Sequence, residues 1–186
     1  MSRFMVVDTP LACLKVITRQ SLRDSRGSFC RLFCEGELAS AGWTKPVVQI
    51  NHSYTRNRGT VRGLHFQRPP KTEMKLVSCI RGEVWDVAVD IRIGSPTFLH
   101  WHAVHLSKEN ELAFLIPEGF AHGFQALTDD VELIYCHSAP YSSSHEGGLS
   151  ALDKNLDIQW PLPVGELSFR DAGYPSVASA FEGSSL

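Results

Sequence analysis

The chain has 186 residues, with 18 lysines and arginines against 20 aspartates and glutamates. This length allows one domain with a substantial hydrophobic core, and the balanced charge argues against nucleic-acid or anionic-membrane partners. No apolar run is long enough for a signal peptide or a membrane span. The five scattered cysteines favour reduced thiols. We therefore expect a single cytoplasmic domain over residues 1–186.

Short segments rich in strand-forming residues follow one another through the middle of the chain. Helix is predicted only at 35–41, where Gly42 ends it. Many short strands separated by glycine and proline predict an all-β sandwich, jelly roll or barrel. After Phe169 the chain is rich in serine and alanine, so we expect few anchors and a mobile C-terminal tail. The predicted strands are 47–53, 76–80, 84–90, 98–106, 112–116, 123–127 and 131–136.

Two motifs resemble the two halves of a cupin barrel. Residues 59–67 contain a glycine followed at the expected spacing by His65, and residues 117–122 read Pro-x-Gly-x-x-His, ending at His122. However, Gln67 stands where a metal-binding cupin has its second histidine, and no glutamate follows at 69–71. Two imidazoles without thiolate or carboxylate make a poor zinc or iron site. We therefore expect no metal, and histidines that are free for proton transfer.

Further motifs occur in a fixed order across about residues 8–175. They include 24–29, 49–53, 62–67, 86–92, 94–98, 116–124, 158–161 and 167–171. In this order they resemble the dTDP-4-dehydrorhamnose 3,5-epimerase family of nucleotide-sugar enzymes. The resemblance implies a cupin-like jelly-roll barrel with short flanking helices. It also implies a homodimer with exchanged N-terminal strands.

The resemblance implies cofactor-free epimerisation of a nucleoside-diphosphate 4-keto-6-deoxy-hexose at C3, C5 or both. A base removes the hydrogen beside the C4 ketone from one face, and an acid returns a proton to the other. His65 matches the family's base, and Asp171 matches the carboxylate that orients it. Tyr135 matches the acid, with Tyr141 as its competitor. Lys75 matches the cation beside the developing oxyanion.

The other predicted site residues bind substrate. An arginine fork suits a diphosphate better than a lysine does. Arg26 and Arg62 match family positions in this role, and Arg170 is the third candidate. The resemblance implies further substrate contacts from Phe29, Gln49 and Asn51 at the nucleotide end, from His122 near the catalytic group, and from Tyr141.

Arg31 departs from the family pattern, which has a glutamate at this position. Replacing an acceptor-only carboxylate with a donor-only guanidinium changes which base or sugar edges can be bonded. Thymidine, cytidine and guanosine diphosphates therefore all stay open. His100, His102 and His105 form a second histidine cluster, for which we favour an outward, solvated face over a metal pair.

Two other function classes are compatible with the residues. One is a metal-dependent cupin isomerase or dioxygenase, against which Gln67 argues. The other is a non-catalytic sugar-binding cupin, against which the joint presence of base, acid and lysine argues. Each side chain also has a structural interpretation, with Tyr135 as a core phenol, Lys75 as an edge-strand charge and Asp171 as an exposed loop carboxylate.

Overall fold

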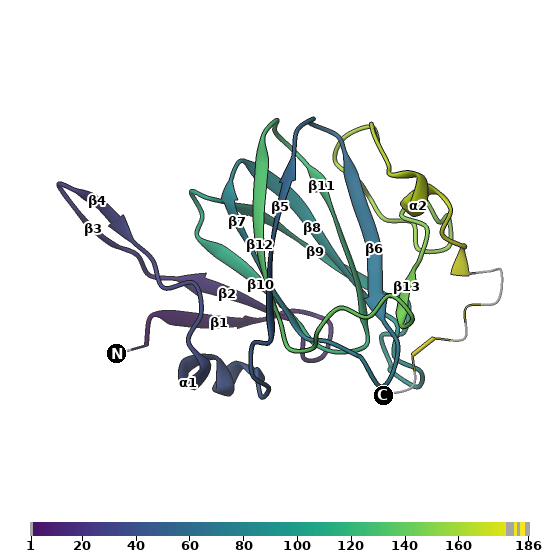
Figure 1. The fold of residues 1–186 in the computed structure, drawn as a ribbon, viewed down its shortest axis with the longest axis horizontal. Coiled ribbons are helices and arrows are strands. Elements are labelled where there is room, and N and C mark those ends of the chain that lie inside the picture. The colour runs from purple at the N-terminus through teal and green to yellow at the C-terminus, as the bar shows by residue number, and fades with distance from the viewer. Residues whose placement is uncertain (1, 178–180, 182, 185–186) are drawn as a thin grey trace.

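The computed structural model describes residues 2–177, 181 and 183–184 (Figure 1). Two antiparallel sheets and one separate hairpin contain the strands, and the helices are short. One sheet holds β1 (Phe4–Asp8), β2 (Lys15–Arg19), β5 (Gln49–Thr55), β7 (Lys75–Arg81), β10 (Leu112–Ile116) and β12 (Val131–His137). The other holds β6 (Val61–Gln67), β8 (Glu83–Asp90), β9 (Trp101–Ser107), β11 (Phe120–Ala126) and β13 (Glu146–Gly148). The hairpin is β3 (Leu22–Asp24) with β4 (Gly27–Phe29), and the helices are α1 (Glu35–Leu38), the 3-10 helix η1 (Ala39–Ala41) and α2 (Phe169–Ala172).

The strand order is that of a jelly roll. The six-stranded sheet runs β1-β2-β10-β7-β12-β5, and the five-stranded sheet runs β13-β6-β11-β8-β9. Neighbours in space are mostly distant in sequence, so the chain crosses repeatedly between the two sheets. The predicted cupin-like, all-β fold with short flanking helices is confirmed.

Most predicted strands lie within about two residues of those observed, because their apolar residues alternate clearly. β11 begins three residues earlier than predicted, at Phe120 rather than at 123, and β9 begins three residues later, at Trp101 rather than at 98. Upstream of it, the hydroxyls of Ser95 and Thr97 donate to Asp90 Oδ2 at 2.6 and 2.7 Å. These bonds fold 95–97 into a turn, and Leu99 then adopts a positive φ of 63°.

The barrel interior is apolar at one end and polar at the other. Along β12, Val131 and Leu133 belong to the core between the sheets, whereas Tyr135 and His137 border a cavity. On the neighbouring β7, Val77 and Cys79 belong to the same core, and Lys75 borders the cavity. Successive inward positions of a strand are two residues apart. The change in polarity along these two strands therefore defines where the cavity lies.

A β-bulge in β6 aims two polar side chains at that cavity. His65 pairs with His122 on β11, and Arg62 pairs with Phe124, so β6 spends one more residue than β11 between the two pairs. This extra residue lets Arg62 and His65 both line the cavity although they are three apart. Gly63 lies in the bulge with a φ of 120°, and a Cβ there would come within 2.6 Å of the Gly123 Cα. The two backbones can approach this closely only because both residues are glycines.

The C-terminal segment is better anchored than its composition predicts. The Phe181 ring packs edge-on against Phe66, with 5.9 Å between ring centroids. The Ser184 N–H donates to the Ile91 carbonyl at 2.7 Å, and the Ile93 N–H donates to the Ser184 carbonyl at 3.0 Å. The expectation of few anchors is therefore wrong for the described part of the tail. Residues 185–186, where we expected mobility, lie outside the described residues.

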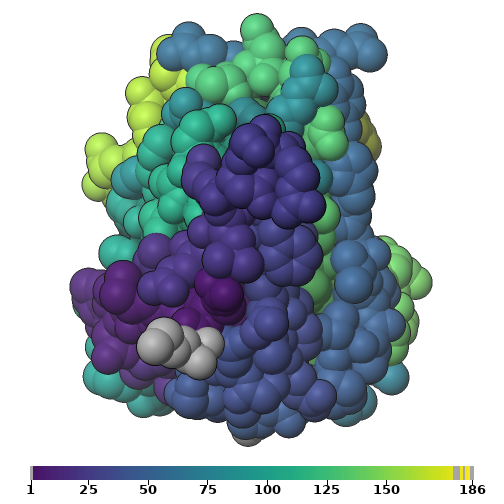
Figure 2. Space-filling model, turned by 90° about the vertical axis from the view of Figure 1, so that its left-hand side faces the viewer, coloured from purple at the N-terminus to yellow at the C-terminus, as the bar shows by residue number. Residues whose placement is uncertain are grey.

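The β3–β4 hairpin projects from the barrel beside β1 and β2 (Figure 1). Figure 2 views the molecule from this side, where the N-terminal strands and the hairpin stand in front of the barrel. The residues of the β3–β4 hairpin are exposed throughout. Among the described residues, no helix is long and apolar enough to cross a membrane.

Asp90 offers a test of the packing beneath the 92–97 loop. Its side chain is fully buried and accepts from Arg92 Nε at 2.8 Å and Nη2 at 2.7 Å, besides the Ser95 and Thr97 hydroxyls. Burial alone would raise the pKa of this carboxyl, but these hydrogen bonds lower it to about 2. Asp90→Asn should lower the free energy of unfolding by about 3–5 kcal/mol, because it leaves Arg92 without its anionic partner. Urea denaturation at pH 7 measures this loss.

The same substitution should change the pH dependence of stability. The pKa of Asp90 is about 2 in the folded chain and about 3.9 in an unfolded one. Its contribution is therefore present above about pH 4 and is lost as the pH falls through 2. Asp90→Asn should flatten the stability curve across this window. The matched control, Asp24→Asn, removes an exposed carboxylate paired with Arg26 and should change little. Equal stability of Asp90→Asn and the wild type would contradict the assigned role.

Candidate active site

A cavity of about 530 Å³ opens between the two sheets at the polar end of the barrel. Side chains from both sheets reach it, so a ligand there would be contacted from opposite sides. Eight of the residues predicted from the sequence line it, namely Asn51, Arg62, His65, Lys75, His122, Tyr135, Tyr141 and Arg170.

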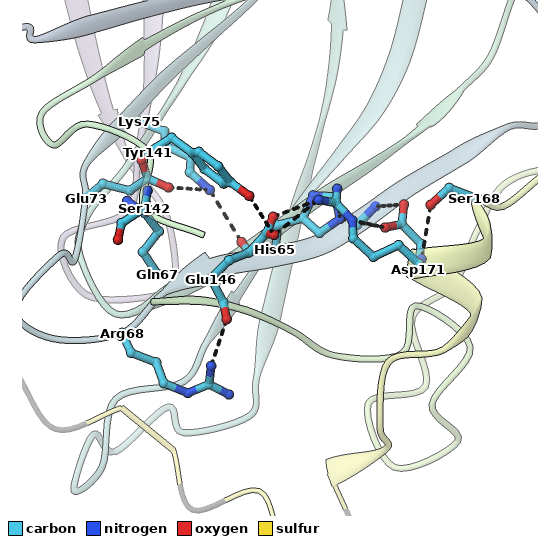
Figure 3. A network of polar contacts seen from close by, with 12 residues as sticks. His65, Gln67, Arg68, Glu73, Lys75, Tyr141, Ser142, Glu146, Ser168 and Asp171 are labelled. Carbon is cyan, nitrogen blue, oxygen red and sulfur yellow. Dashed lines mark hydrogen bonds and ion pairs between the residues drawn. The ribbon is translucent and has the colours of Figure 1, made fainter. Parts of the chain in front are cut away.

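His65 and Asp171 form the central polar contact (Figure 3). His65 Nε2 lies 2.8 Å from Asp171 Oδ1, and Asp171 Oδ2 accepts from the Gly63 N–H at 3.2 Å. Burial alone would raise the pKa of Asp171, but hydrogen bonds from His65 and Gly63 lower it to about 2. An ionised carboxylate only accepts hydrogen bonds, so His65 Nε2 carries the proton. In neutral His65 the other nitrogen, Nδ1, is then free to act as a base.

The position of Asp171 is set by α2. Ser168 caps this helix, and its hydroxyl accepts from the Asp171 N–H at 3.0 Å. Asp171 is 4% exposed, so the structural interpretation as an exposed loop carboxylate is wrong. The Ser-x-x-Asp spacing at 168–171 is a helix-start signal that the sequence already carries.

Tyr135 belongs to the opposite sheet. Its hydroxyl lies 3.1 Å from the Ser53 hydroxyl, and its ring packs edge-on to His122 and stacks on His137. Burial raises the pKa of Tyr135 well above its usual value. The phenol is therefore protonated at neutral pH and can donate a proton or a hydrogen bond into the cavity. Tyr141 is exposed instead, and its hydroxyl donates to Glu146 Oε2 at 3.1 Å.

Lys75 brings a positive charge to the cavity wall. Its Nζ lies 3.2 Å from Glu73 Oε1 and donates to the His65 carbonyl at 3.4 Å. Glu73 Oε2 also lies 2.8 Å from His137 Nδ1. Burial alone would raise the pKa of Glu73, but the Lys75 charge and the His137 hydrogen bond lower it overall. A buried carboxylate therefore holds the cation next to the proposed base.

A second histidine–aspartate pair lies behind the cavity. His122 Nε2 is 2.9 Å from Asp86 Oδ1, and both side chains are buried. Burial raises the pKa of Asp86, against the opposing influence of His122. Asp86 Oδ2 has no hydrogen-bond partner among the described residues. His65 and His122 are direct neighbours across β6 and β11, so both imidazoles face the cavity from the same sheet.

Two arginines stand where the site opens. Arg62 donates from Nε to the Thr55 hydroxyl and from Nη2 to the Tyr54 carbonyl, both at 2.9 Å. Arg170 Nη1 contacts Glu146 Oε1 at 2.9 Å. Both arginines also border a second cavity of about 600 Å³, which shares His65 with the first. Two fixed guanidinium groups at one opening give a site suited to a phosphate-bearing ligand.

Gln67 does structural work at the position where a metal-binding cupin has its second histidine. Its Nε2 donates to the Lys71 carbonyl at 3.0 Å, and its Oε1 accepts from the Ser142 N–H at 2.6 Å. The amide therefore ties together the two loops beside β6. No group of three or more potential metal ligands occurs among the described histidines, cysteines, aspartates and glutamates.

Besides Asp171, which borders the second cavity, three predicted residues do not line this cavity. Gln49 sits at its rim, where its Nε2 donates to Asn51 Oδ1 at 3.0 Å. Arg26 and Phe29 lie on the projecting β3–β4 hairpin, where Arg26 pairs with Asp24 and Phe29 is 68% exposed. Their roles as substrate-binding residues stay predictions.

The structure also locates Arg31 and the second histidine cluster, whose roles the sequence left open. Arg31 pairs with Glu37 of α1 and lines neither cavity. The outward face predicted for the second histidine cluster is wrong for His102, whose ring packs edge-on to the buried Phe114 at 6.3 Å. Burial lowers the pKa of His102. His105 is exposed and pairs with Glu83, as an outward residue would.

Sequence reasoning missed Glu73, His137, Asp86 and Glu146. Weak signals existed for two of them. Glu73 and His137 each stand two residues from a predicted catalytic residue, Lys75 and Tyr135 respectively, and in a strand such residues share a face. Asp86 and Glu146 gave no comparable signal, because their partners are distant in sequence.

Comparisons with known proteins identify the family and agree with the fold. The family model described as dTDP-4-dehydrorhamnose 3,5-epimerase matches residues 8–179. An enzyme of that name from Sinorhizobium fredii is 42% identical over 168 residues, covering 90% of this chain and 86% of its own. The crystal structure of a Legionella pneumophila dTDP-6-deoxy-D-glucose-3,5-epimerase in complex with dTDP-4-keto-L-rhamnose superposes with a TM-score of 0.90 at 40% identity, covering 95% and 94% of the two chains.

The structure of a relative with a different named activity is also similar to this chain. It is a 3'-monoepimerase from Streptomyces bikiniensis in complex with dTDP-quinovose, with a TM-score of 0.85 and 32% identity over 91% of this chain and 86% of that one. The family model covers nearly the whole chain, and the fold agrees with solved relatives at substantial identity. The chain therefore belongs to the dTDP-4-dehydrorhamnose 3,5-epimerase family of carbohydrate epimerases.

Proposed function

We propose that the chain epimerises a nucleoside-diphosphate 4-keto-6-deoxy-hexose at C3, C5 or both, without a cofactor. The observation that carries this proposal is the arrangement of acid–base groups across one cavity. His65, oriented by Asp171, comes from the five-stranded sheet, and Tyr135 comes from the six-stranded sheet. Inverting a carbon requires a base on one face and an acid on the other.

In the proposed mechanism His65 acts first. Its free nitrogen removes the hydrogen from the carbon beside the C4 ketone, and the ionised Asp171 stabilises the imidazolium that forms. Negative charge then develops on the C4 oxygen, where the Lys75 ammonium stabilises it. Tyr135 returns a proton to the opposite face of the enolate. Its raised pKa keeps that proton available throughout the neutral range.

The relatives indicate which nucleotide the substrate carries. Relatives have been crystallised with dTDP-sugars, which supports thymidine diphosphate as the first candidate. We assign the diphosphate to Arg62 and Arg170 at the cavity opening. The monoepimerase relative has the same fold, so the fold is compatible with inversion at one centre or two.

The function is tested by isotope exchange. The wild type is incubated in deuterated water with 4-keto-6-deoxy-glucose carried on dTDP, CDP or GDP, and label is read at C3 and C5 by NMR. We expect label and inversion with one nucleotide. His65→Ala should lower the exchange rate by at least on the order of 100-fold, because it removes the general base. Its binding of the free nucleotide should persist.

Asp171→Asn serves as the graded companion, because the imidazole remains but loses its charged partner. It should retain more exchange than His65→Ala. If the wild type exchanges no hydrogen with any of the three nucleotides, the proposed function is wrong. If His65→Ala exchanges at the wild-type rate, another residue is the base.

Tyr135→Phe separates exchange from inversion. The ring and its packing remain, but the proton for the opposite face is lost. His65 should still remove the hydrogen and return a deuteron to the original face, so label enters without inversion. Tyr141→Phe should chiefly raise KM, because this exposed residue stands at the rim. Normal inversion by Tyr135→Phe, with exchange-only behaviour in Tyr141→Phe, would reverse the two assignments.

We further propose that the chain is a homodimer in which N-terminal strands are exchanged. β1 is an edge strand of the six-stranded sheet and carries the exposed side chains of Met5, Val6 and Val7. An apolar edge of this kind is a typical surface for self-association. The projecting hairpin would then carry Arg26 and Phe29 to a second subunit, which gives these residues a route to a substrate.

The oligomeric state can be tested by measuring the mass of the protein in solution. Light scattering coupled to size exclusion at micromolar concentration should give twice the mass of the chain. Val6→Lys should lower that mass towards the monomer, because it places a charge within the proposed apolar interface. The control is Lys154→Glu. Lys154 is exposed and belongs neither to β1 nor to the hairpin, so this substitution should leave the dimer intact. A monomeric wild type would overturn the proposal.

A further inference from the structure

Glu73 and His137 line the cavity, but the proposed mechanism gives them no step. Both side chains are 10% exposed, and that of Lys75 is 9% exposed. Register places the group together, because His137 on β12 pairs directly with Lys75 on β7. Burying three ionisable groups is costly unless each has a partner. Here Glu73 is the shared partner, with one oxygen toward Lys75 and the other toward His137.

The contacts continue from His137 to the rim of the cavity. His137 Nε2 lies 3.3 Å from Asn51 Nδ2, and Asn51 Oδ1 accepts from Gln49 Nε2 at 3.0 Å. Gln49 Oε1 in turn accepts from the Tyr141 N–H at 2.9 Å. The chain of contacts thus connects an exposed loop with a buried ammonium group.

Hydrogen-bonding chemistry fixes the direction of this chain. At one end the backbone N–H of Tyr141 can only donate, and at the other the ionised Glu73 can only accept. Gln49 and Asn51 must therefore each accept with their oxygen and donate with their nitrogen. His137 then accepts at Nε2 and donates from Nδ1 to Glu73. Every donor has its acceptor, so the imidazole is held as a single tautomer.

We propose that His137 and Glu73 are positioning residues, which hold the Lys75 ammonium where the C4 oxygen becomes negative and link it to the polar groups at the cavity rim. The inference rests on the proposed function, because Lys75 has a reacting oxygen to stabilise only if the substrate is a keto sugar. Lys75 has a long flexible side chain, and its only other polar contact among the described residues is the weak 3.4 Å bond to the His65 carbonyl. Glu73 therefore supplies most of its restraint, and His137 restrains Glu73.

Two substitutions of His137 separate positioning from packing. The ring stacks on Tyr135, with 6.1 Å between centroids and 25° between planes. His137→Phe preserves a stacking ring but deletes both polar contacts. His137→Gln loses the ring but offers an amide donor to Glu73 and an amide acceptor to Asn51. Positioning predicts that the glutamine variant is the more active, whereas packing predicts that the phenylalanine variant is.

The readout is the deuterium exchange rate with the substrate that the wild type accepts. For His137→Phe and Glu73→Gln we expect kcat to fall on the order of 100-fold, the cost of misplacing a catalytic group by about 1 Å. KM should change little, because the diphosphate is held elsewhere. His137→Gln should keep most of kcat. The matched control is His105→Gln, which removes another histidine–glutamate pair of 2.8 Å, exposed and outside the site, and should leave kcat unchanged.

A second measurement needs no substrate. Reductive methylation followed by peptide mass spectrometry gives the rate at which the Lys75 amine is modified, with exposed Lys45 as the internal reference. Freed from Glu73, Lys75 should react faster relative to Lys45 in Glu73→Gln and in His137→Phe than in the wild type. The proposal is overturned if that ratio is unchanged, or if His137→Phe keeps wild-type kcat while His137→Gln loses it. Absence of exchange by the wild type would instead remove the proposed function, and the methylation ratio would still decide whether Glu73 and His137 hold Lys75.

Discussion

The Asp171 carboxylate joins the two parts of the molecule that the site requires. One oxygen bonds His65 and the other bonds the backbone of Gly63, so a residue late in the chain holds both the side chain and the main chain of β6. Its own position comes from the Ser168 cap of α2. A buried carboxylate is favourable only when its lone pairs are satisfied, as they are here. The orientation of His65 and the docking of the C-terminal segment therefore depend on the same group.

Around this contact, the cavity is lined by polar side chains that are paired in advance. His122 has Asp86, Lys75 has Glu73, and Arg170 has Glu146. A preorganised set of charges needs little rearrangement when a transition state forms, which is the basis of electrostatic catalysis. The apolar half of the barrel contributes by excluding water and by keeping the two sheets at a fixed separation. Stability and chemistry are thus divided between the two ends of one barrel.

Much of the fold could be predicted from local pattern. Alternation located β5, β7, β8, β10 and β12 closely, since one face of each strand packs on a core, but β1, β2, β6 and β13 carried no strand prediction. The start of β9 was missed because hydroxyl bonds to Asp90 bend the chain, and no periodicity reports such a contact. His102 was misplaced for a related reason, because alternation assigns a residue to a face but does not say which face is buried.

The site was predicted unevenly. Family motifs pointed to the eight residues that share the cavity and also to Asp171, although His65 and Asp171 are 106 positions apart. Arg26 and Phe29 were not located there, because they lie on an exposed hairpin that projects from the barrel. Glu73 and His137 were overlooked because they act on other side chains. Motif reading finds groups that touch a ligand more readily than groups that hold those groups.

Gln67 has a consequence for how this barrel could change its chemistry. In a metal-binding cupin the residue at that position coordinates the metal ion. It does not have to hold neighbouring segments of the same chain in place. Here both polar atoms of the Gln67 amide form hydrogen bonds. Nε2 donates to the carbonyls of Lys71 and Pro140, and Oε1 accepts from the Ser142 N–H beside Tyr141. Installing a histidine at this position would release the loop that closes the rim of the cavity. Gaining a metal ligand at this position would therefore cost the barrel the contacts that now hold its rim.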